Sequence, residues 1–149
     1  THKFPHSHRP SPSPQCMGPS MLPTFNINGD IAITDLMSVK LHKIQVGDVV
    51  IAKSVQNPKQ QVCKRIMGME GDTVIVPFSS SSSHASGGPP SRVITVPKGH
   101  VWLQGDNFHN STDSRHYGPV PYAMLLGRVW AKVWPLHEAG WIERGNVGE

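Results

Sequence analysis

The chain has 149 residues, of which 37% are hydrophobic and 16% are charged, which is enough apolar material for one domain with its own core. Its net charge of +4 comes without any run of Lys and Arg, so we expect no nucleic-acid partner. Two cysteines without a CxxC motif argue against a disulfide framework or a zinc site. We therefore expect no metal and no cofactor.

The chain begins with a segment, residues 1–16, that is rich in Pro, Ser and His and predicts a disordered tail. Across the whole chain, fourteen Gly and fourteen Pro favour short strands joined by turns. We predict one mainly all-β domain over residues 17–137, with a flexible Ser-rich insertion at 79–91 and a C-terminal tail at 138–149. The β-rich segments are residues 30–34, 49–52, 61–67, 73–76, 93–96, 100–103 and 127–134, and residues 122–126 fit one helical turn.

Ser20 is the first residue that suggests chemistry, because it lies in a segment with two prolines, Pro19 and Pro23. The prolines restrict the backbone on both sides, and a fixed backbone orients a hydroxyl for attack. A serine hydroxyl becomes a good nucleophile only when a base removes its proton. Taken alone, this segment is equally an ordinary loop.

Lys64 is the candidate base, because it lies in an apolar stretch, residues 62–67. A free lysine has a pKa of about 10.4, and burial among apolar groups is what lowers that pKa enough for the amine to act as a base. Alternation along a strand places Arg65 on the opposite face. The alternative is a surface lysine paired with Glu70 or Asp72.

A third segment, residues 105–118, carries many short polar side chains, which form turns and bond to nearby backbone groups. Asp113 and Arg115 are two positions apart, so they share a face of an extended chain and are suited to an ion pair. A polar surface loop is the alternative. The polar and charged residues here are Asp106, Asn107, Asn110, Ser111, Thr112, Asp113, Ser114 and Arg115.

Taken together, the three segments resemble the type I signal peptidases, a family of serine/lysine proteases. The family's serine box, Ser-Met-x-Pro-Thr, matches residues 20–24. Its lysine box, Lys-Arg-(Val/Ile)-x-Gly-x-x-Gly-Asp, matches residues 64–72. Its last box, Gly-Asp-Asn followed by Ser-x-Asp-Ser-Arg-x-x-Gly, matches residues 105–107 and 111–118. The boxes follow the family's order.

The resemblance implies an antiparallel β catalytic core and a role for each matched residue. Ser20 would attack the scissile carbonyl, and its backbone amide would help to form the oxyanion hole. Lys64 would take the proton of the hydroxyl and pass it to the leaving amine. Ser111 would hydrogen-bond the lysine, while Asp113 and Arg115 would brace the site as an ion pair.

The resemblance also implies where substrate binds and where the protein works. Substrate would lie extended beside the lysine strand, in contact with Met21, Pro23 and Cys63. Together with Cys63, residues 110–113 and 127–136 look most like the family's mitochondrial inner-membrane members. Such a protein would remove N-terminal sorting peptides from precursor proteins delivered to the intermembrane space. It would act at the inner membrane, facing that space, with a second subunit as partner in a heterodimer and the membrane surface beside it.

The sequence departs from the family pattern at two places. Bacterial relatives often carry a serine two residues before the nucleophile as an oxyanion donor, and here that position is Gly18. Family members also carry a hydrophobic anchor before the serine box, whereas residues 1–16 hold none, and no segment has the roughly 18 consecutive apolar residues of a membrane span. We expect the anchor either to lie upstream of residue 1 or to be missing.

Two other functions remain open on these residues. Autoproteolytic repressor-type peptidases share the serine/lysine pair, but their DNA-binding domain is absent here and the third box fits signal peptidases better. A non-catalytic or anchor-less partner subunit of the same peptidase complex would keep the fold, although intact Ser20, Lys64 and Ser111 argue against it.

Overall fold

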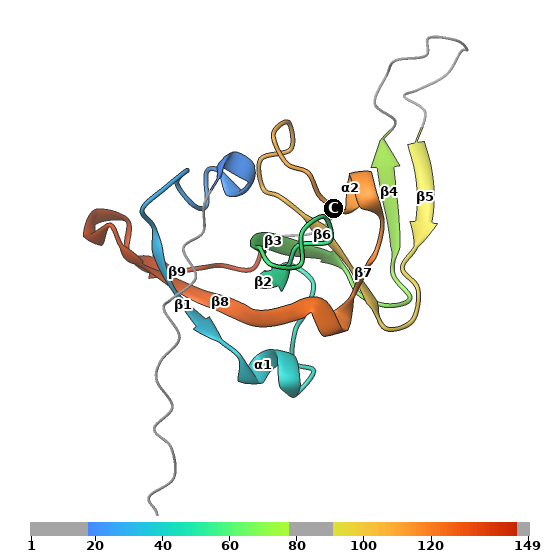
Figure 1. Cartoon of the computed structure of the whole chain (residues 1–149), viewed down its shortest axis with the longest axis horizontal. Helices are drawn as coiled ribbons and strands as arrows, with labels where there is room; N and C mark the ends of the chain where they lie inside the picture. Colours follow the sequence, from blue (N-terminus) through green and yellow to red (C-terminus); the bar gives the residue numbers. More distant parts are fainter. Residues whose placement is uncertain (1–17, 78–90, 146–149) are drawn as a thin grey trace, which may run out of the picture.

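The computed structural model describes residues 18–77 and 91–145 (Figure 1). Seven of the nine strands in this part form one sheet in the order β1-β8-β2-β3-β6-β7, with β9 also paired to β8, and strands β4 and β5 form a separate two-stranded sheet. Every strand pair in the described part is antiparallel. The strands are β1 (Ile31–Asp35), β2 (Val49–Lys53), β3 (Gln61–Gly68), β4 (Thr73–Pro77), β5 (Ser91–Thr95), β6 (His100–Gln104), β7 (Val120–Pro121), β8 (Leu125–Trp134) and β9 (Gly140–Trp141).

Helical segments are short, as the Gly and Pro content predicts. Three are 3-10 turns and two are single α-helical turns: η1 (Pro19–Met21), α1 (Met37–Lys40), α2 (Ser114–Tyr117), η2 (Tyr122–Met124) and η3 (Leu136–Glu138). The mainly antiparallel β fold class is confirmed, and η2 occurs where one helical turn is predicted. Helices α1 and α2 are not predicted from the sequence, because a four-residue helix has almost no periodicity to detect.

Strands β2 and β3 lie at the centre of the large sheet and are buried on both faces. Alternate side chains of the two strands enter two different core clusters. Val50, Ala52 and Ile66 pack in the first cluster, while Ile51 and Cys63 pack in the second. A polar side chain on the middle of β3 is therefore desolvated whichever face it occupies.

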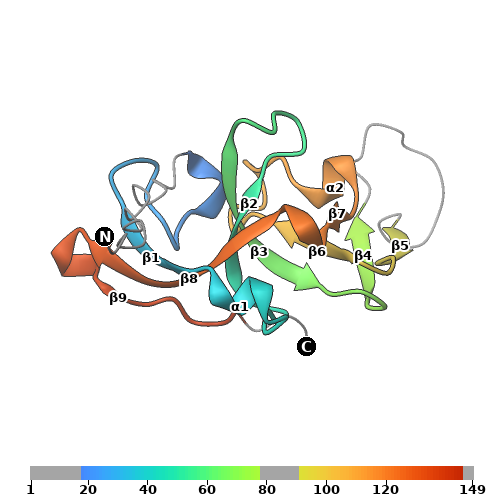
Figure 2. The same ribbon diagram turned by 60° about the horizontal axis from the view of Figure 1, so that its bottom comes forward.

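The β4–β5 hairpin lies at one end of the molecule, and β1 and β9 lie at the other (Figures 1 and 2). Residues 138–145, expected as a tail, continue the folded part. The Ile142 amide donates to the Trp130 carbonyl at 2.7 Å, and Gly140–Trp141 pairs with β8. The predicted tail at 1–16 and nearly all of the predicted insertion at 79–91 lie outside the described residues. Within the described ranges, no helix has the length and apolar character needed to cross a membrane.

The first core cluster leads to a stability prediction. Leu125 is 4% exposed, so Leu125→Ala leaves a cavity and should lower the free energy of unfolding by about 2 to 5 kcal/mol. Leu136 is 73% exposed, and Leu136→Ala should change it by less than about 0.5 kcal/mol. Urea unfolding of both variants measures the difference. Equal losses would contradict the assignment of Leu125 to the core.

Candidate active site

Ser20 and Lys64 meet although they lie 44 residues apart in the sequence. Ser20 is in η1, which opens at Gly18 with φ at 103°, a value that favours glycine, and continues with Pro19. Turn η1 packs against β3, and Lys64 Nζ lies 2.6 Å from Ser20 Oγ, within hydrogen-bond distance. The fold thus brings together the two residues predicted to carry the chemistry.

The Lys64 amine is shielded from water. Its residue is 4% exposed, and burial lowers the pKa of the ammonium group below its ordinary value of 10.5. The charge of Asp113 opposes this shift, but the net direction stays downward. The alternative of a surface lysine paired with Glu70 or Asp72 does not hold, because Lys64 is buried and its amine lies against Ser20. Glu70 and Asp72 instead accept the backbone amides of Gly99 and Met69.

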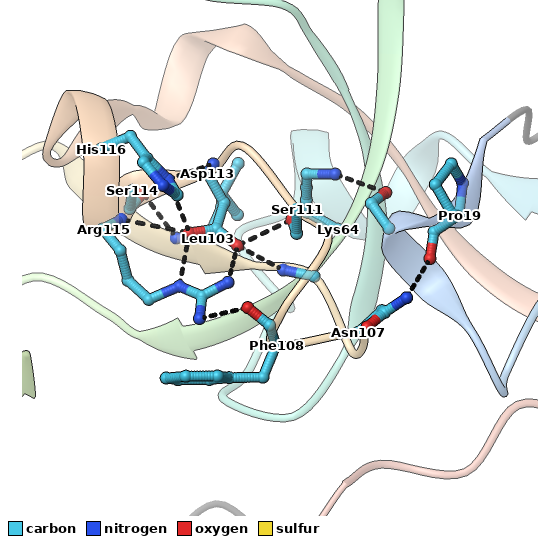
Figure 3. A network of polar contacts seen from close by, with 12 residues as sticks. Pro19, Lys64, Leu103, Asn107, Phe108, Ser111, Asp113, Ser114, Arg115 and His116 are labelled. Atoms are coloured by element: carbon cyan, nitrogen blue, oxygen red, sulfur yellow. Dashed lines mark hydrogen bonds and ion pairs between the residues drawn. The ribbon is translucent and has the colours of Figure 1, made fainter. Parts of the chain in front are cut away.

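A polar network centred on Asp113 lies beside the lysine (Figure 3). Asp113 is fully buried and pairs with Arg115, with Nη2 and Oδ2 at 2.7 Å. It also accepts the Gly105 amide and the Ser111 hydroxyl, at 2.9 and 2.8 Å. Burial by itself would raise the pKa of Asp113, but these hydrogen bonds and the Arg115 charge hold it below its ordinary value of 3.8. The carboxylate is therefore ionised and fixed.

Ser111 lies next to the serine turn, but its hydrogen bond differs from the expected one. The resemblance implies a bond to Lys64, whereas in the structure the hydroxyl donates to Asp113. Gly105 explains the close packing: a Cβ atom there would lie 2.3 Å from Ser111 Oγ and 2.4 Å from the Ser20 carbonyl oxygen. Any larger residue at 105 would push the third segment away from the serine turn.

A second network joins the same three segments on the other side of β3. Arg65 Nη2 lies 2.7 Å from Asp106 Oδ2, and Thr24 donates its hydroxyl to the same carboxylate oxygen. Arg65 also donates to the carbonyls of Gly47 and Glu143, at 2.7 and 3.1 Å. Alternation along the strand predicts that Arg65 lies away from Lys64, but it indicates no partner for Arg65 or for Asp106. In the sequence, the signal for this pair is that Arg65 lies in the lysine box and Asp106 lies in the last box.

Three residues are predicted to contact substrate, and they differ in exposure. Met21 and Cys63 are 2% and 9% exposed and pack in the second core cluster, whereas Pro23 is exposed. The side chains of Met21 and Cys63 therefore belong to the core on which η1 and β3 pack. Contact of all three residues with substrate stays a prediction.

The arrangement is suited to proton transfer from a hydroxyl. An amine whose protonated form is disfavoured lies within hydrogen-bond distance of a serine on a rigid turn, the geometry that nucleophilic catalysis requires. Among the described residues, no group of three or more His, Cys, Asp or Glu side chains is arranged to hold a metal ion.

The comparison with protein families agrees with the matched boxes. The model of the signal peptidase family, peptidase S26, matches residues 12–81 and 77–134. The chain belongs to this family and is a peptidase, as the sequence resemblance predicts. The match covers the serine turn, the lysine strand and the polar third segment.

Among curated proteins, the chain is similar to mitochondrial inner membrane protease subunit 1 of Homo sapiens, with 46% identity over 89% of this chain and 75% of that protein. It is 48% identical to mitochondrial ATP-independent inner membrane protease subunit 1a of Arabidopsis thaliana, over 79% of this chain and 67% of that protein. Subunit 2 of the inner membrane protease of Danio rerio is 34% identical over 79% of this chain and 61% of that protein. A solved signal peptidase I from Enterococcus faecalis is 27% identical over 57% of this chain and 95% of that one, with a TM-score of 0.45.

The Asp113 network leads to a prediction about stability and pH. Asp113→Asn leaves the nearly buried Arg115 without its anionic partner, so it should lower the free energy of unfolding by about 3 to 5 kcal/mol at pH 7. The pKa of Asp113 is lowered in the folded state, so its contribution is present above about pH 4 and is lost as the pH falls through the folded pKa. The difference between wild type and variant should shrink over that window.

Urea unfolding between pH 7 and pH 3 measures this effect. Glu143→Gln, at an exposed carboxylate, is the matched control and should change stability by less than about 0.5 kcal/mol. A difference that stays constant with pH would show that the ionised carboxylate is not the stabilising group.

Proposed function

We propose that this chain is a serine endopeptidase with a Ser20–Lys64 dyad that removes N-terminal sorting peptides from proteins delivered to the mitochondrial intermembrane space. The observation that carries the proposal is the 2.6 Å approach of Lys64 Nζ to Ser20 Oγ inside a desolvated site. Membership of the signal peptidase family supplies the reaction class.

The reaction begins when neutral Lys64 takes the hydroxyl proton of Ser20. The Ser20 oxygen attacks the scissile carbonyl, and the tetrahedral oxyanion accepts a hydrogen bond from the Ser20 backbone amide, an interaction worth about 3 to 4 kcal/mol per donor. The Lys64 ammonium then donates its proton to the leaving amine as the C–N bond breaks. Water, deprotonated by Lys64, hydrolyses the acyl-enzyme and regenerates the hydroxyl.

Ser111, Asp113 and Arg115 act in this proposal as positioning residues. Asp113 accepts from both Ser111 and Arg115, so the three move as one unit beside the lysine. The negative charge of Asp113 limits how far the pKa of Lys64 falls, after the dominant effect of burial. This balance keeps the amine basic enough to take the hydroxyl proton of Ser20.

Substrate is expected to lie along β3. Strand β6 pairs with β3 only from Arg65 to Gly68, whereas β2 pairs with residues 61–65. No other described strand pairs with residues 61–64 on the edge opposite β2, and an extended peptide is able to add there by backbone hydrogen bonds. This edge begins at the strand position of Lys64 and is flanked by η1, so a bound peptide would lie beside the backbone at Met21 and Cys63 and near the exposed Pro23.

The names of the relatives support the compartment and the partner that we propose. Proteins 46 to 48% identical to this chain are named as subunit 1 of mitochondrial inner membrane proteases, and a less similar one is named as subunit 2. We therefore assign the chain to the inner membrane, facing the intermembrane space. Its proposed partners are precursor proteins, the membrane surface and a second peptidase subunit in a heterodimer.

Cleavage of a precursor protein in detergent tests the dyad. Wild type should cut at one bond, while Ser20→Ala and Lys64→Met should each lower turnover by several powers of ten, because each removes a group that acts in the chemical step. Ser91→Ala and Lys53→Met change exposed residues of the same types and should keep wild-type turnover. Wild-type activity that survives in Ser20→Ala would exclude Ser20 as the nucleophile. Silence of all proteins, even with the second subunit added, would favour a non-catalytic subunit.

The pH dependence of cleavage tests the base separately. Lys64 acts only when neutral, and burial holds its pKa below 10.5, so kcat/KM should rise with pH to a plateau, with a midpoint below 10.5. Initial rates between pH 6 and pH 10 give the profile, and Lys53→Met should leave the midpoint unchanged. A rate that is independent of pH over this range would argue against a lysine base.

A further inference from the structure

We propose that Asn107 is a positioning residue that aims the Ser20 backbone amide at the oxyanion, an inference that rests on the function proposed above. Asn107 follows Asp106 in the third segment and is half-buried. Within the described residues, its side chain donates to the backbone of the turn that carries the nucleophile, whereas the Ser20 hydroxyl is hydrogen-bonded by Lys64.

Asn107 holds that backbone at two successive carbonyl groups. Its side-chain Nδ2 donates to the Pro19 carbonyl oxygen at 3.0 Å (Figure 3). Its backbone amide donates to the Ser20 carbonyl oxygen at 2.9 Å. The Pro19 carbonyl also accepts the Leu22 amide, but at the longer distance of 3.3 Å. One residue from the third segment therefore clamps the peptide units on both sides of Ser20.

The clamp on Pro19 determines the direction of the proposed oxyanion donor. The Pro19 carbonyl and the Ser20 N–H belong to the same planar peptide unit, so fixing the carbonyl fixes the direction of the N–H. A carbonyl that accepts a hydrogen bond also polarises its peptide unit, which strengthens the N–H as a donor. The Asn107 side chain thus acts on the oxyanion hole through the peptide bond.

The hold of Asn107 on the direction of the Ser20 N–H matters more in this chain than in a relative with a serine two residues before the nucleophile, because residue 18 is glycine. Glycine offers no side-chain hydroxyl that could serve as a second donor to the oxyanion, and with φ at 103° it places little intrinsic restraint on the turn. Pro19 has no N–H through which to be held. Orientation of the Ser20 amide therefore relies on the carbonyl side of the peptide unit, where Asn107 bonds.

Two substitutions test the role. Asn107→Asp keeps the shape and the backbone bond to Ser20 but loses the Nδ2 donor, and Asn107→Ala removes the donor without adding charge. Loss of a whole oxyanion donor costs about 10²–10³-fold in kcat, so misaiming it should cost about 10- to 100-fold, with KM changed less than about twofold. Asn110→Asp and Asn110→Ala, at an exposed position of the same segment, are matched controls and should keep wild-type kcat.

A peptide aldehyde separates this role from a merely structural one. Ser20 Oγ adds to the aldehyde carbonyl, and its proton passes to Lys64, giving a tetrahedral adduct whose oxygen occupies the oxyanion position. The inhibition constant should rise in both Asn107 variants by the same factor as kcat falls. Binding of the uncleaved peptide, measured in the Ser20→Ala background, should not change, and neither should the pH midpoint of kcat/KM in Asn107→Ala.

The outcomes are distinct. If kcat and aldehyde affinity are unchanged in both Asn107 variants, the role of Asn107 is overturned. Cleavage by the wild type in the same assay would leave the proposed function intact. A parallel loss of peptide binding, or a thermal midpoint lowered far below that of the Asn110 variants, would assign Asn107 a structural role and overturn the inference. A wild type that neither cleaves precursor nor forms the aldehyde adduct would overturn the proposed function and this inference with it.

Discussion

The burial of one amine is the constraint on which the rest of this structure depends. Lys64 extends from the middle of a strand that is covered on both faces, and it ends beside Ser20. Desolvating a charged group is unfavourable, so the fold lowers the pKa of the amine and stabilises its neutral form relative to water. Covering the centre of the sheet therefore serves two purposes: it forms the core, and it makes a lysine suitable as a base.

Strand β3 carries Lys64 and Arg65 in succession. Because side chains alternate along a strand, the two lie on opposite faces and in different surroundings. Lys64 faces a site in which its charge is poorly compensated, whereas Arg65 is met by Asp106 and by two backbone carbonyls. A guanidinium group cannot be deprotonated in a protein and provides several donors in one plane, so it suits a permanent structural junction. An ammonium group on a flexible stem changes its pKa readily when buried, which suits a reactive site.

Two ion pairs of low exposure, Arg65–Asp106 and Asp113–Arg115, bring the polar third segment into place. Arg65–Asp106 ties that segment to β3 and to residues 143–145, and Asp113–Arg115 fixes the turn at α2. Buried ion pairs often contribute little net stability because desolvation offsets their attraction. We take their contribution to be geometric: with Gly105 allowing close approach, they bring Ser111 and the Asn107 amide groups against the serine turn.

The mainly β class, most strand positions and the identity of the chemical groups were predictable from the sequence, because alternation, turn residues and the spacing within the three boxes are local properties. The pairing of Asp113 with Arg115 was predictable for the same reason, since two positions separate them. The folded chain alone shows that Arg65 meets Asp106, and that residues 140–142 pair with β8 where a tail is predicted. Each of these contacts depends on how distant segments cross the sheet, and on which face a side chain is buried, so no local pattern in the chain encodes it.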